Sequence, residues 1–117
     1  MGNISIILRR PPYGTVDASE AIRHALGGVT EDVAVNLILV DSGVNSARKE
    51  QEISNTEYLS IESGIRDCID MGVNVYIDKA SLKKEHIEID EIIEGIIVVN
   101  SSKIAGLIKE SDTTMIF

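Results

Sequence analysis

The residues with binding or reactive chemistry lie mostly between stretches of β-branched residues. Residues 9–15 read RRPPYGT, which places two guanidinium groups and a glycine-containing turn directly before a helix start. Free backbone N–H groups and the helix dipole favour an anion at such a place. Alternatively, both arginines pair with acidic side chains of this chain or of a partner, because no glycine-rich phosphate fingerprint is present. The candidate ligand-binding residues are Arg10, Tyr13, Gly14 and Thr15.

Two aspartates, Asp41 and Asp78, each end a predicted strand. Phospho-acceptor receiver domains have aspartates at strand ends, but they also need an acidic pair after the first strand to hold a metal. Arg9 and Arg10 occupy that place here, so the motif is incomplete. We interpret Asp41 and Asp78 as turn formers or helix caps. A weak enzyme that uses Asp78 and Lys79 is a third and less favoured hypothesis, after the two functions given at the end of this section.

The remaining chemically versatile residues are one cysteine and two histidines. Cys68 lies on an apolar stripe with Asp67 and Asp70 nearby, which raises rather than lowers a thiol pKa, so we interpret it as a buried, inert residue. His24 and His86 lack the spacing of metal ligands and are interpreted as surface histidines. We therefore expect no catalytic residue, no metal site and no cofactor.

The elements that position these residues alternate between two kinds. Apolar runs rich in β-branched residues predict strands, and each is followed by a helix start signal, which is typical of a parallel sheet covered by helices. The predicted strands are Asn3–Arg9, Asp32–Asp41, Val73–Asp78, Gly95–Val99 and Thr113–Phe117. We expect a single domain, residues 1–117, with a three-layer α/β/α fold and a mainly parallel sheet of about five strands. Ligands of such sheets bind beyond the carboxyl ends of the strands.

Helix signals lie between the strands. Asp17-x-x-Glu20 opens a first helix that Gly27-Gly28 ends, and Ser54-x-x-Glu57 opens a second that Gly72 ends. The apolar face of the second helix holds Tyr58, Ile61, Ile65, Cys68 and Ile69. Short helical pieces are expected at Ser81–Glu85 and Ala47–Gln51. We expect a last helix that is capped by Ser101 or Ser102. Its inward-facing residues are expected to be Ile104, Leu107 and Ile108.

Composition narrows the class of protein. With 117 residues, 44% hydrophobic and 26% charged, the chain is neither disordered nor membrane-spanning, since no apolar run approaches about 20 residues. Residues 1–4 lack the pattern of a signal peptide, so we expect a cytoplasmic protein. A net charge of −8 and only 3% aromatic residues argue against direct nucleic-acid binding. The acidic run Glu85–Glu94 alternates with isoleucines, which fits a solvated segment or a subunit contact.

The order of short motifs along the chain resembles the DsrE/DsrF-like sulfur-relay family, and most of all its DsrF/TusC-type subunit. The motifs that carry this resemblance are Pro12-Tyr13-Gly14-Thr15, a helix ending Ala25-Leu26, Asp32-Val33-Ala34-Val35, the strand end Val40-Asp41-Ser42-Gly43-Val44, Gly72, the turn Ala80-Ser81-Leu82-Lys83-Lys84 and a terminal Met115-Ile116-Phe117. They span nearly the whole length in the family's order.

The resemblance implies a small α/β domain in a ring or a pair of trimers. Sulfur-carrying members hold a reactive cysteine at the end of the third strand, from which persulfide sulfur passes on toward tRNA thiolation or in sulfur oxidation. Here that neighbourhood is residues 76–81, with Asp78 near the cysteine position and no thiol. Cys68 does not match that position.

We therefore expect a non-catalytic subunit of a cytoplasmic sulfur-relay assembly, not an enzyme by itself, that supports cysteine-bearing partner subunits. Its partners would be further copies of itself or related sulfur-relay subunits, with no nucleic acid and no membrane. The alternative is a small binding module that holds an anionic metabolite or nucleotide at the loop after the first strand, through Arg10, Gly14 and Thr15.

Overall fold

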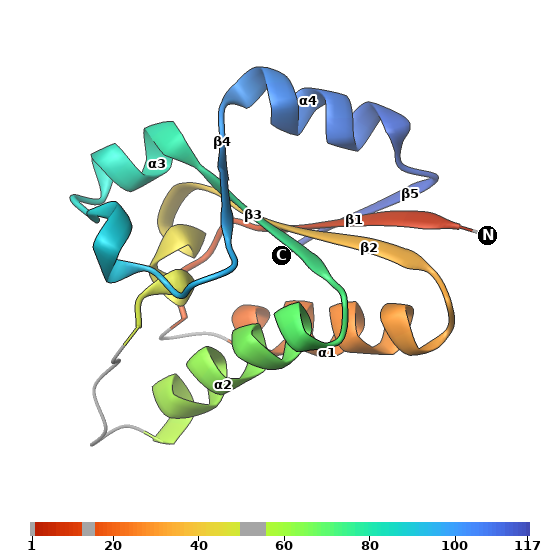
Figure 1. Cartoon of the computed structure of the whole chain (residues 1–117), viewed down its shortest axis with the longest axis horizontal. Helices are drawn as coiled ribbons and strands as arrows, with labels where there is room; N and C mark the ends of the chain where they lie inside the picture. Colours follow the sequence, from red (N-terminus) through yellow and green to blue (C-terminus); the bar gives the residue numbers. More distant parts are fainter. Residues whose placement is uncertain (1, 13–15, 50–55) are drawn as a thin grey trace.

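The computed structural model describes residues 2–12, 16–49 and 56–117, and for residues 56–60 the backbone alone. Its centre is a parallel sheet with strand order β4-β3-β2-β1-β5 (Figure 1). The strands are β1 (Asn3–Leu8), β2 (Ala34–Leu39), β3 (Asn74–Asp78), β4 (Ile97–Val99) and β5 (Thr113–Ile116). Each lies within the range predicted for it, because β-branched apolar runs mark strands buried in a parallel sheet.

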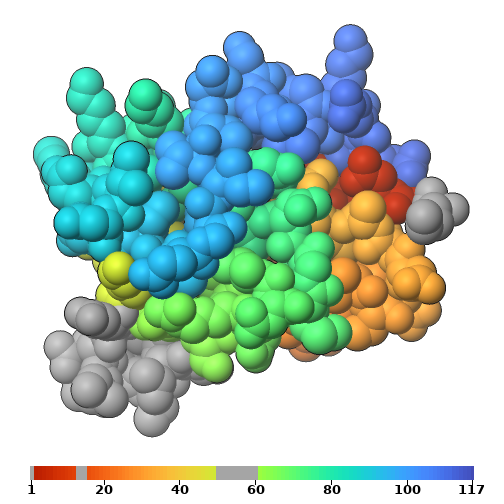
Figure 2. Space-filling model, in the orientation of Figure 1, coloured from red at the N-terminus to blue at the C-terminus, as the bar shows by residue number. Residues whose placement is uncertain are grey.

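Helices cover both faces of the sheet, so the expected three-layer α/β/α fold is confirmed (Figure 1). One face packs against α1 (Asp17–Thr30) and α2 (Thr56–Asp70), and the other against α4 (Ser101–Glu110). Three short helices follow strands or loops on one side of the molecule: η1 (Asp41–Ala47), α3 (Lys79–Lys84) and η2 (Ile89–Glu91). Figure 2 shows the α3 segment and the residues after it at one end of the molecule, beside the segment that holds β4.

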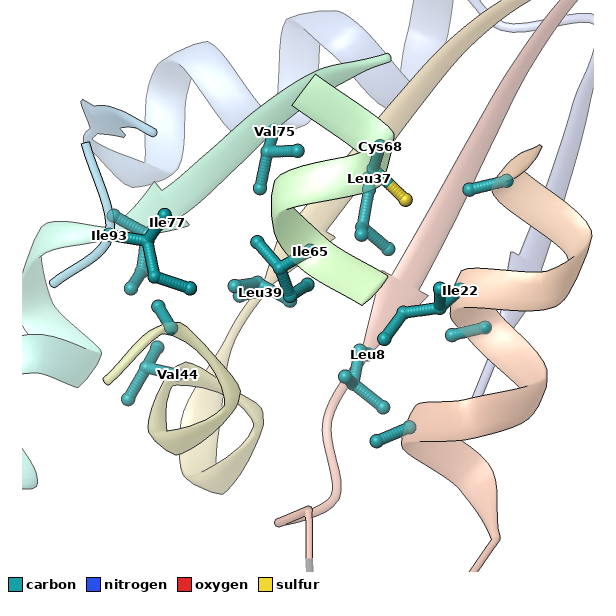
Figure 3. Close-up of a cluster of buried hydrophobic side chains, with 14 of the residues drawn as sticks. Leu8, Ile22, Leu37, Leu39, Val44, Ile65, Cys68, Val75, Ile77 and Ile93 are labelled. Atoms are coloured by element: carbon teal, nitrogen blue, oxygen red, sulfur yellow. The ribbon is translucent and has the colours of Figure 1, made fainter. Parts of the chain in front are cut away.

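The main core lies between the sheet and the helix pair α1 and α2 (Figure 3). Alternate strand residues face it, as the pleat requires: Leu8 from β1, Leu37 from β2 and Val75 from β3 are fully buried. The predicted apolar face of α2 is confirmed where side chains are described, since Ile61, Ile65 and Cys68 are buried there. The side chain of Tyr58 lies outside the described residues.

A second, smaller core lies under α4. Ile7 and Ile38 point to this face and pack with Leu107, and Ile104 and Ile108 contact the same cluster. The inward positions predicted for the last helix are therefore confirmed.

The strand register brings the strand ends together at one edge of the sheet. Leu8 of β1 lies beside Leu39 of β2, Leu39 beside Ile77 of β3, and Ile77 beside Val98 of β4. The residues that follow each strand, and with them the candidate site, therefore meet at the carboxyl edge.

The end predicted for α1 is wrong. The helix continues through Gly27 and Gly28 to Thr30, and the chain then turns at Asp32, whose φ is +61°. A Cβ atom at Gly28 would lie 2.8 Å from Cγ2 of Val35, so this glycine allows the helix to pack closely on β2. At the other end, Asp17 is the first helical residue, and the N-cap residue Val16 has no side chain that could accept a capping hydrogen bond.

Other boundaries also differ from prediction. The last helix is capped by Asn100, whose side chain accepts a hydrogen bond from the Lys103 amide at 2.9 Å, rather than by Ser101 or Ser102. The short helix after β3 begins at Lys79. The helical piece expected at 47–51 lies earlier, as η1, and residues 50–55, including Ser54, lie outside the described residues.

The predicted stop of α2 at Gly72 is confirmed. Gly72 has a φ of +98°, and its amide donates to the Ile69 carbonyl at 3.2 Å. The Val73 amide donates to the Cys68 carbonyl at 2.9 Å, which closes the end of the helix.

Candidate functional site at the carboxyl edge of the sheet

Asp78 lies at the end of β3 and organises the turn into α3. Its Oδ2 atom accepts hydrogen bonds from the Ser81 amide at 3.2 Å and from the Ser81 hydroxyl at 2.6 Å. The Asp41 amide donates to the same Ser81 hydroxyl oxygen at 2.8 Å, so the ends of β2 and β3 are joined through one buried serine. The prediction that Asp78 is a helix cap is confirmed, and Asp41, with a φ of +50°, forms the turn after β2.

Side chains of η1 hold this turn against α3. The Asn45 amide group donates to the Glu85 carboxylate at 2.8 Å and to the Ser42 carbonyl at 3.1 Å. Arg48, the C-cap residue of η1, donates to the Asn45 side-chain oxygen at 3.0 Å, so Asn45 links η1 to the end of α3. Such a fully bonded polar cluster fixes the position of α3 relative to β2 and β3.

The chemistry at position 78 is that of a hydrogen-bond acceptor. One carboxylate oxygen of Asp78 caps α3, and the other, Oδ1, is buried without a hydrogen-bond partner among the described residues. A carboxylate cannot carry persulfide sulfur, because it has no thiol sulfur to which a second sulfur can bond. The turn between β3 and α3 therefore has a structural role. Sulfur transfer at this edge would need a thiol from another subunit.

The loop after β1 holds its arginines in ion pairs. Arg9 lies 3.7 Å from the Asp41 carboxylate, and Arg10 lies 3.3 Å from the Asp17 carboxylate. These contacts are the alternative expected for the two arginines. Both side chains of the Arg9–Asp41 pair are exposed, so that pair has small energetic weight, whereas Asp17 is partly buried. The other candidate ligand residues of this loop, Tyr13, Gly14 and Thr15, lie outside the described residues. Anion binding by the loop stays a prediction.

Cys68 lies away from this edge. It is in the last turn of α2, near the start of β3, with its side chain fully buried in the main core (Figure 3). Burial raises the pKa of the Cys68 thiol to about 12, and the charge of Asp67 adds to the rise. A thiol with this pKa is protonated at neutral pH, so its environment disfavours nucleophilic chemistry.

The two histidines are exposed, as expected, and lie on different elements. His24 of α1 stacks at an angle on Phe117, with ring centres 5.5 Å apart, and His86 follows α3 with a φ of +57°. Among the residues that the structure describes, no three His, Cys, Asp or Glu side chains are placed to hold a metal ion. Within the same residues, no helix is long and apolar enough to cross a membrane.

Sequence reasoning missed a hollow between α3, the segment after it and β4. It has a volume of about 330 Å³ and is lined by Lys79, Leu82, Lys83, His86, Ile87, Glu88, Ile89 and Val98. The spacing of Lys79 and Lys83, four residues apart on one helix, is the only signal of it in the sequence. Val98 comes from β4, so the hollow exists only once the sheet has formed.

Comparison with known proteins shows to which family a chain with this fold belongs. The sequence profile of the DsrE/DsrF-like family matches residues 2–117. The chain belongs to the DsrE/DsrF-like family.

Among its relatives is the intracellular sulfur oxidation protein DsrF of Allochromatium vinosum. The two sequences are 27% identical, over 93% of this chain and 91% of the relative. An uncharacterised protein of Methanocaldococcus jannaschii is 30% identical over 97% of both chains. The crystal structure of the YchN protein from E. coli superposes with a TM-score of 0.83 at 18% identity over the whole of both chains, which supports the fold. A protein of unknown function from Methanobacterium thermoautotrophicum superposes with a TM-score of 0.75 at 15% identity, again over the whole of both chains.

Proposed function

We propose that this protein is a non-catalytic subunit of a cytoplasmic sulfur-relay assembly, in which it supports partner subunits that carry a reactive cysteine. Membership of the DsrE/DsrF-like family supports a link to sulfur relay, and so does the similarity to a protein named for intracellular sulfur oxidation. We further infer that residues 1–117 act as one domain, in a homo-oligomer or in a hetero-oligomer with related subunits.

The observation that carries this proposal is the nature of residue 78. In the sulfur-carrying members that the sequence resembles, the end of the third strand holds the reactive cysteine. Here the end of β3 holds Asp78, whose carboxylate caps α3 through Ser81. A side chain committed to holding the turn supports a role in shaping an assembly, with the thiol supplied by another subunit.

The experiment is to mix the protein with a related subunit from the same genome that has a cysteine at the end of its third strand. We expect the two to elute together in a fixed ratio on size exclusion. After incubation with a persulfide donor, intact mass analysis should show added sulfur on the cysteine-bearing subunit and none on this chain.

A matched variant tests whether residue 78 decides the division of roles. Asp78→Cys restores a thiol at the strand end, and we expect it to accept sulfur that the natural chain does not. The natural chain gaining sulfur at Cys68, or forming no complex with any cysteine-bearing relative, would falsify the proposal.

A further inference from the structure

The hollow between α3, the segment after it and β4 is shaped by the way α3 ends. The Ile87 amide donates to the Leu82 carbonyl at 2.9 Å. The His86 amide donates to the Lys83 carbonyl at 3.2 Å, and His86 has a φ of +57°. These two bonds form a Schellman motif, which packs the apolar side chains at its two ends together. Leu82 and Ile87 are accordingly buried, and with Val98 of β4 they form an apolar part of the lining.

The size and place of the hollow suit a small organic molecule. Its volume of about 330 Å³ lies at the lower end of the range of about 300–1,000 Å³ that is usual for ligand pockets. Because α3 follows the carboxyl end of β3, the hollow lies at the edge where ligands of parallel sheets bind. Figure 2 shows the segments that line it together at one end of the molecule.

Two lysines bring positive charge to the hollow. Lys79 and Lys83 are four residues apart on α3, so they lie on the same side of this helix, and both line the hollow. Both are exposed, and neither forms an ion pair within 4.0 Å among the residues that the structure describes. Every arginine of the chain and Lys49, in contrast, lies within 4.0 Å of a carboxylate. The two lysines are therefore available to an anion from solution.

One acidic side chain, that of Glu88, also lines the hollow. It is exposed and forms no ion pair with either lysine. With two lysines, one glutamate and His86 counted as neutral, the lining that the structure describes has a formal charge of +1, in a chain of net charge −8. The hollow therefore favours a bound anion over a cation.

We propose that this hollow binds a small organic anion, with a carboxylate or phosphate head on Lys79 and Lys83 and an apolar body on the apolar part of the lining. Charge-assisted hydrogen bonds from the two ammonium groups hold the head. Removal of apolar surface from water holds the body, and Ile89 at the hollow, 65% exposed, can cover part of it.

The two kinds of lining together are the reason to choose this class of ligand. An inorganic anion would use the lysines and leave the apolar lining exposed to water. A neutral apolar molecule would cover that lining and leave the lysines unused. The inference goes beyond the proposed function and does not rest on it, because it needs no partner subunit and no thiol.

The test is a titration of the ¹⁵N-labelled chain with four probes, followed by the NMR shifts of its amide signals. We expect hexanoate and hexyl phosphate to shift the signals of residues 79–89 with a millimolar or lower Kd. Hexanol lacks the charge and acetate lacks the apolar body, so each should bind at least about 10-fold more weakly. Binding of either hexyl anion supports the inference, and the ratio of their Kd values identifies the preferred head group.

Charge variants test the role of each group, and the amide spectrum of each variant shows that it is folded. Lys79→Gln/Lys83→Gln should weaken hexanoate binding at least about 10-fold. Lys84→Gln/Lys103→Gln makes the same charge change on exposed lysines outside the described lining, so it is the matched control and should keep the affinity. Glu88→Gln removes the negative charge at the hollow and should strengthen binding.

Four results would each overturn the inference. They are no shift at residues 79–89, equal affinity for hexanol and hexanoate, equal loss of affinity in the two lysine variants, and weaker binding by Glu88→Gln. The last result would show that the ligand carries a cation for Glu88. Sulfur transfer to a cysteine-bearing relative is a separate measurement, so either proposal can fail without the other.

Discussion

The main core encloses Cys68, and this burial raises the pKa of its thiol to about 12. We expect iodoacetamide to leave the folded protein unmodified at pH 8 and to alkylate Cys68 fully after unfolding in urea. Intact mass measures both states. Fast modification of the folded protein would contradict the burial, and the same treatment of Cys68→Ala controls for reaction at other residues.

The same residue links stability to alkaline pH. The thiol is neutral in the folded state up to a pKa of about 12, while in the unfolded chain it ionises from its ordinary value of 9.0. Ionisation of the unfolded state therefore lowers stability between pH 9 and 12 and leaves it unchanged below. Cys68→Ala should lose less stability than the natural chain over this range, as measured by urea unfolding at each pH.

Single residues also show what the sequence can reveal about a site. The burial of Cys68 follows from helical periodicity, and the capping by Asp78 follows from its place at the end of a strand, so both are local and predictable. The hollow between Lys83 and Val98 joins two segments that meet only through strand pairing, and no local pattern encodes that.

At the level of elements, Gly43 fixes how η1 crosses the end of β1. A Cβ atom there would lie 2.1 Å from the Leu8 carbonyl oxygen, and the Gly43 amide donates to the Arg9 carbonyl at 3.1 Å. Backbone atoms cannot rotate away as a side chain can. We expect Gly43→Ala to destabilise the protein by about 1–3 kcal/mol or more, read from the urea midpoint.

Gly106 is the matched control for this substitution. It lies in α4 with nothing within 4 Å of its built Cβ position, and alanine favours helix by about 1 kcal/mol over glycine. Gly106→Ala should therefore be neutral or stabilising. Equal effects of the two substitutions would show that close approach to Leu8 is not what Gly43 provides.

The loop after β1 is the element whose ligand binding stays a prediction. If it holds an anion, sulfate should raise the melting temperature more than chloride at equal ionic strength, and Arg10→Ala should remove the difference. Arg23→Ala removes another surface arginine that pairs with a carboxylate on α1, and it should keep the difference. Equal sulfate responses in the natural chain and in Arg10→Ala would show that Arg10 binds no anion and only forms the ion pair with Asp17.

Element boundaries were predictable where a local rule acts alone. Gly72 ends α2 because its positive φ suits glycine. Gly28 carries the same local signal, yet α1 runs through it, because its function is close packing against Val35 of β2. Tertiary contact therefore overrides a helix-stop signal in one case and agrees with it in the other.

For the molecule as a whole, the alternation of strand and helix signals was enough to predict three layers and a parallel sheet. The order β4-β3-β2-β1-β5 was not predictable in the same way. It depends on the edge of the sheet at which β5 is added after α4, and no local pattern specifies that edge. That helix crosses the face opposite α1 and α2, where its apolar side covers Ile7 and Ile38. The apolar side of α4 indicates that this helix packs on the sheet. Which face of the sheet α4 covers is set by the right-handed crossovers between parallel strands.

The place of β5 has a consequence for how the protein is made in the cell. Its pairing joins Thr113 to Ile4, so β1 keeps one open edge until residues 113–116 have been synthesised, more than 100 residues after β1. At translation rates of about 5–20 residues per second, that interval is roughly 5–20 s. An open edge of apolar strand is a template for pairing with a neighbouring nascent chain. Until residues 113–116 are synthesised, pairing of this edge with a neighbouring chain competes with the native pairing of β1 and β5.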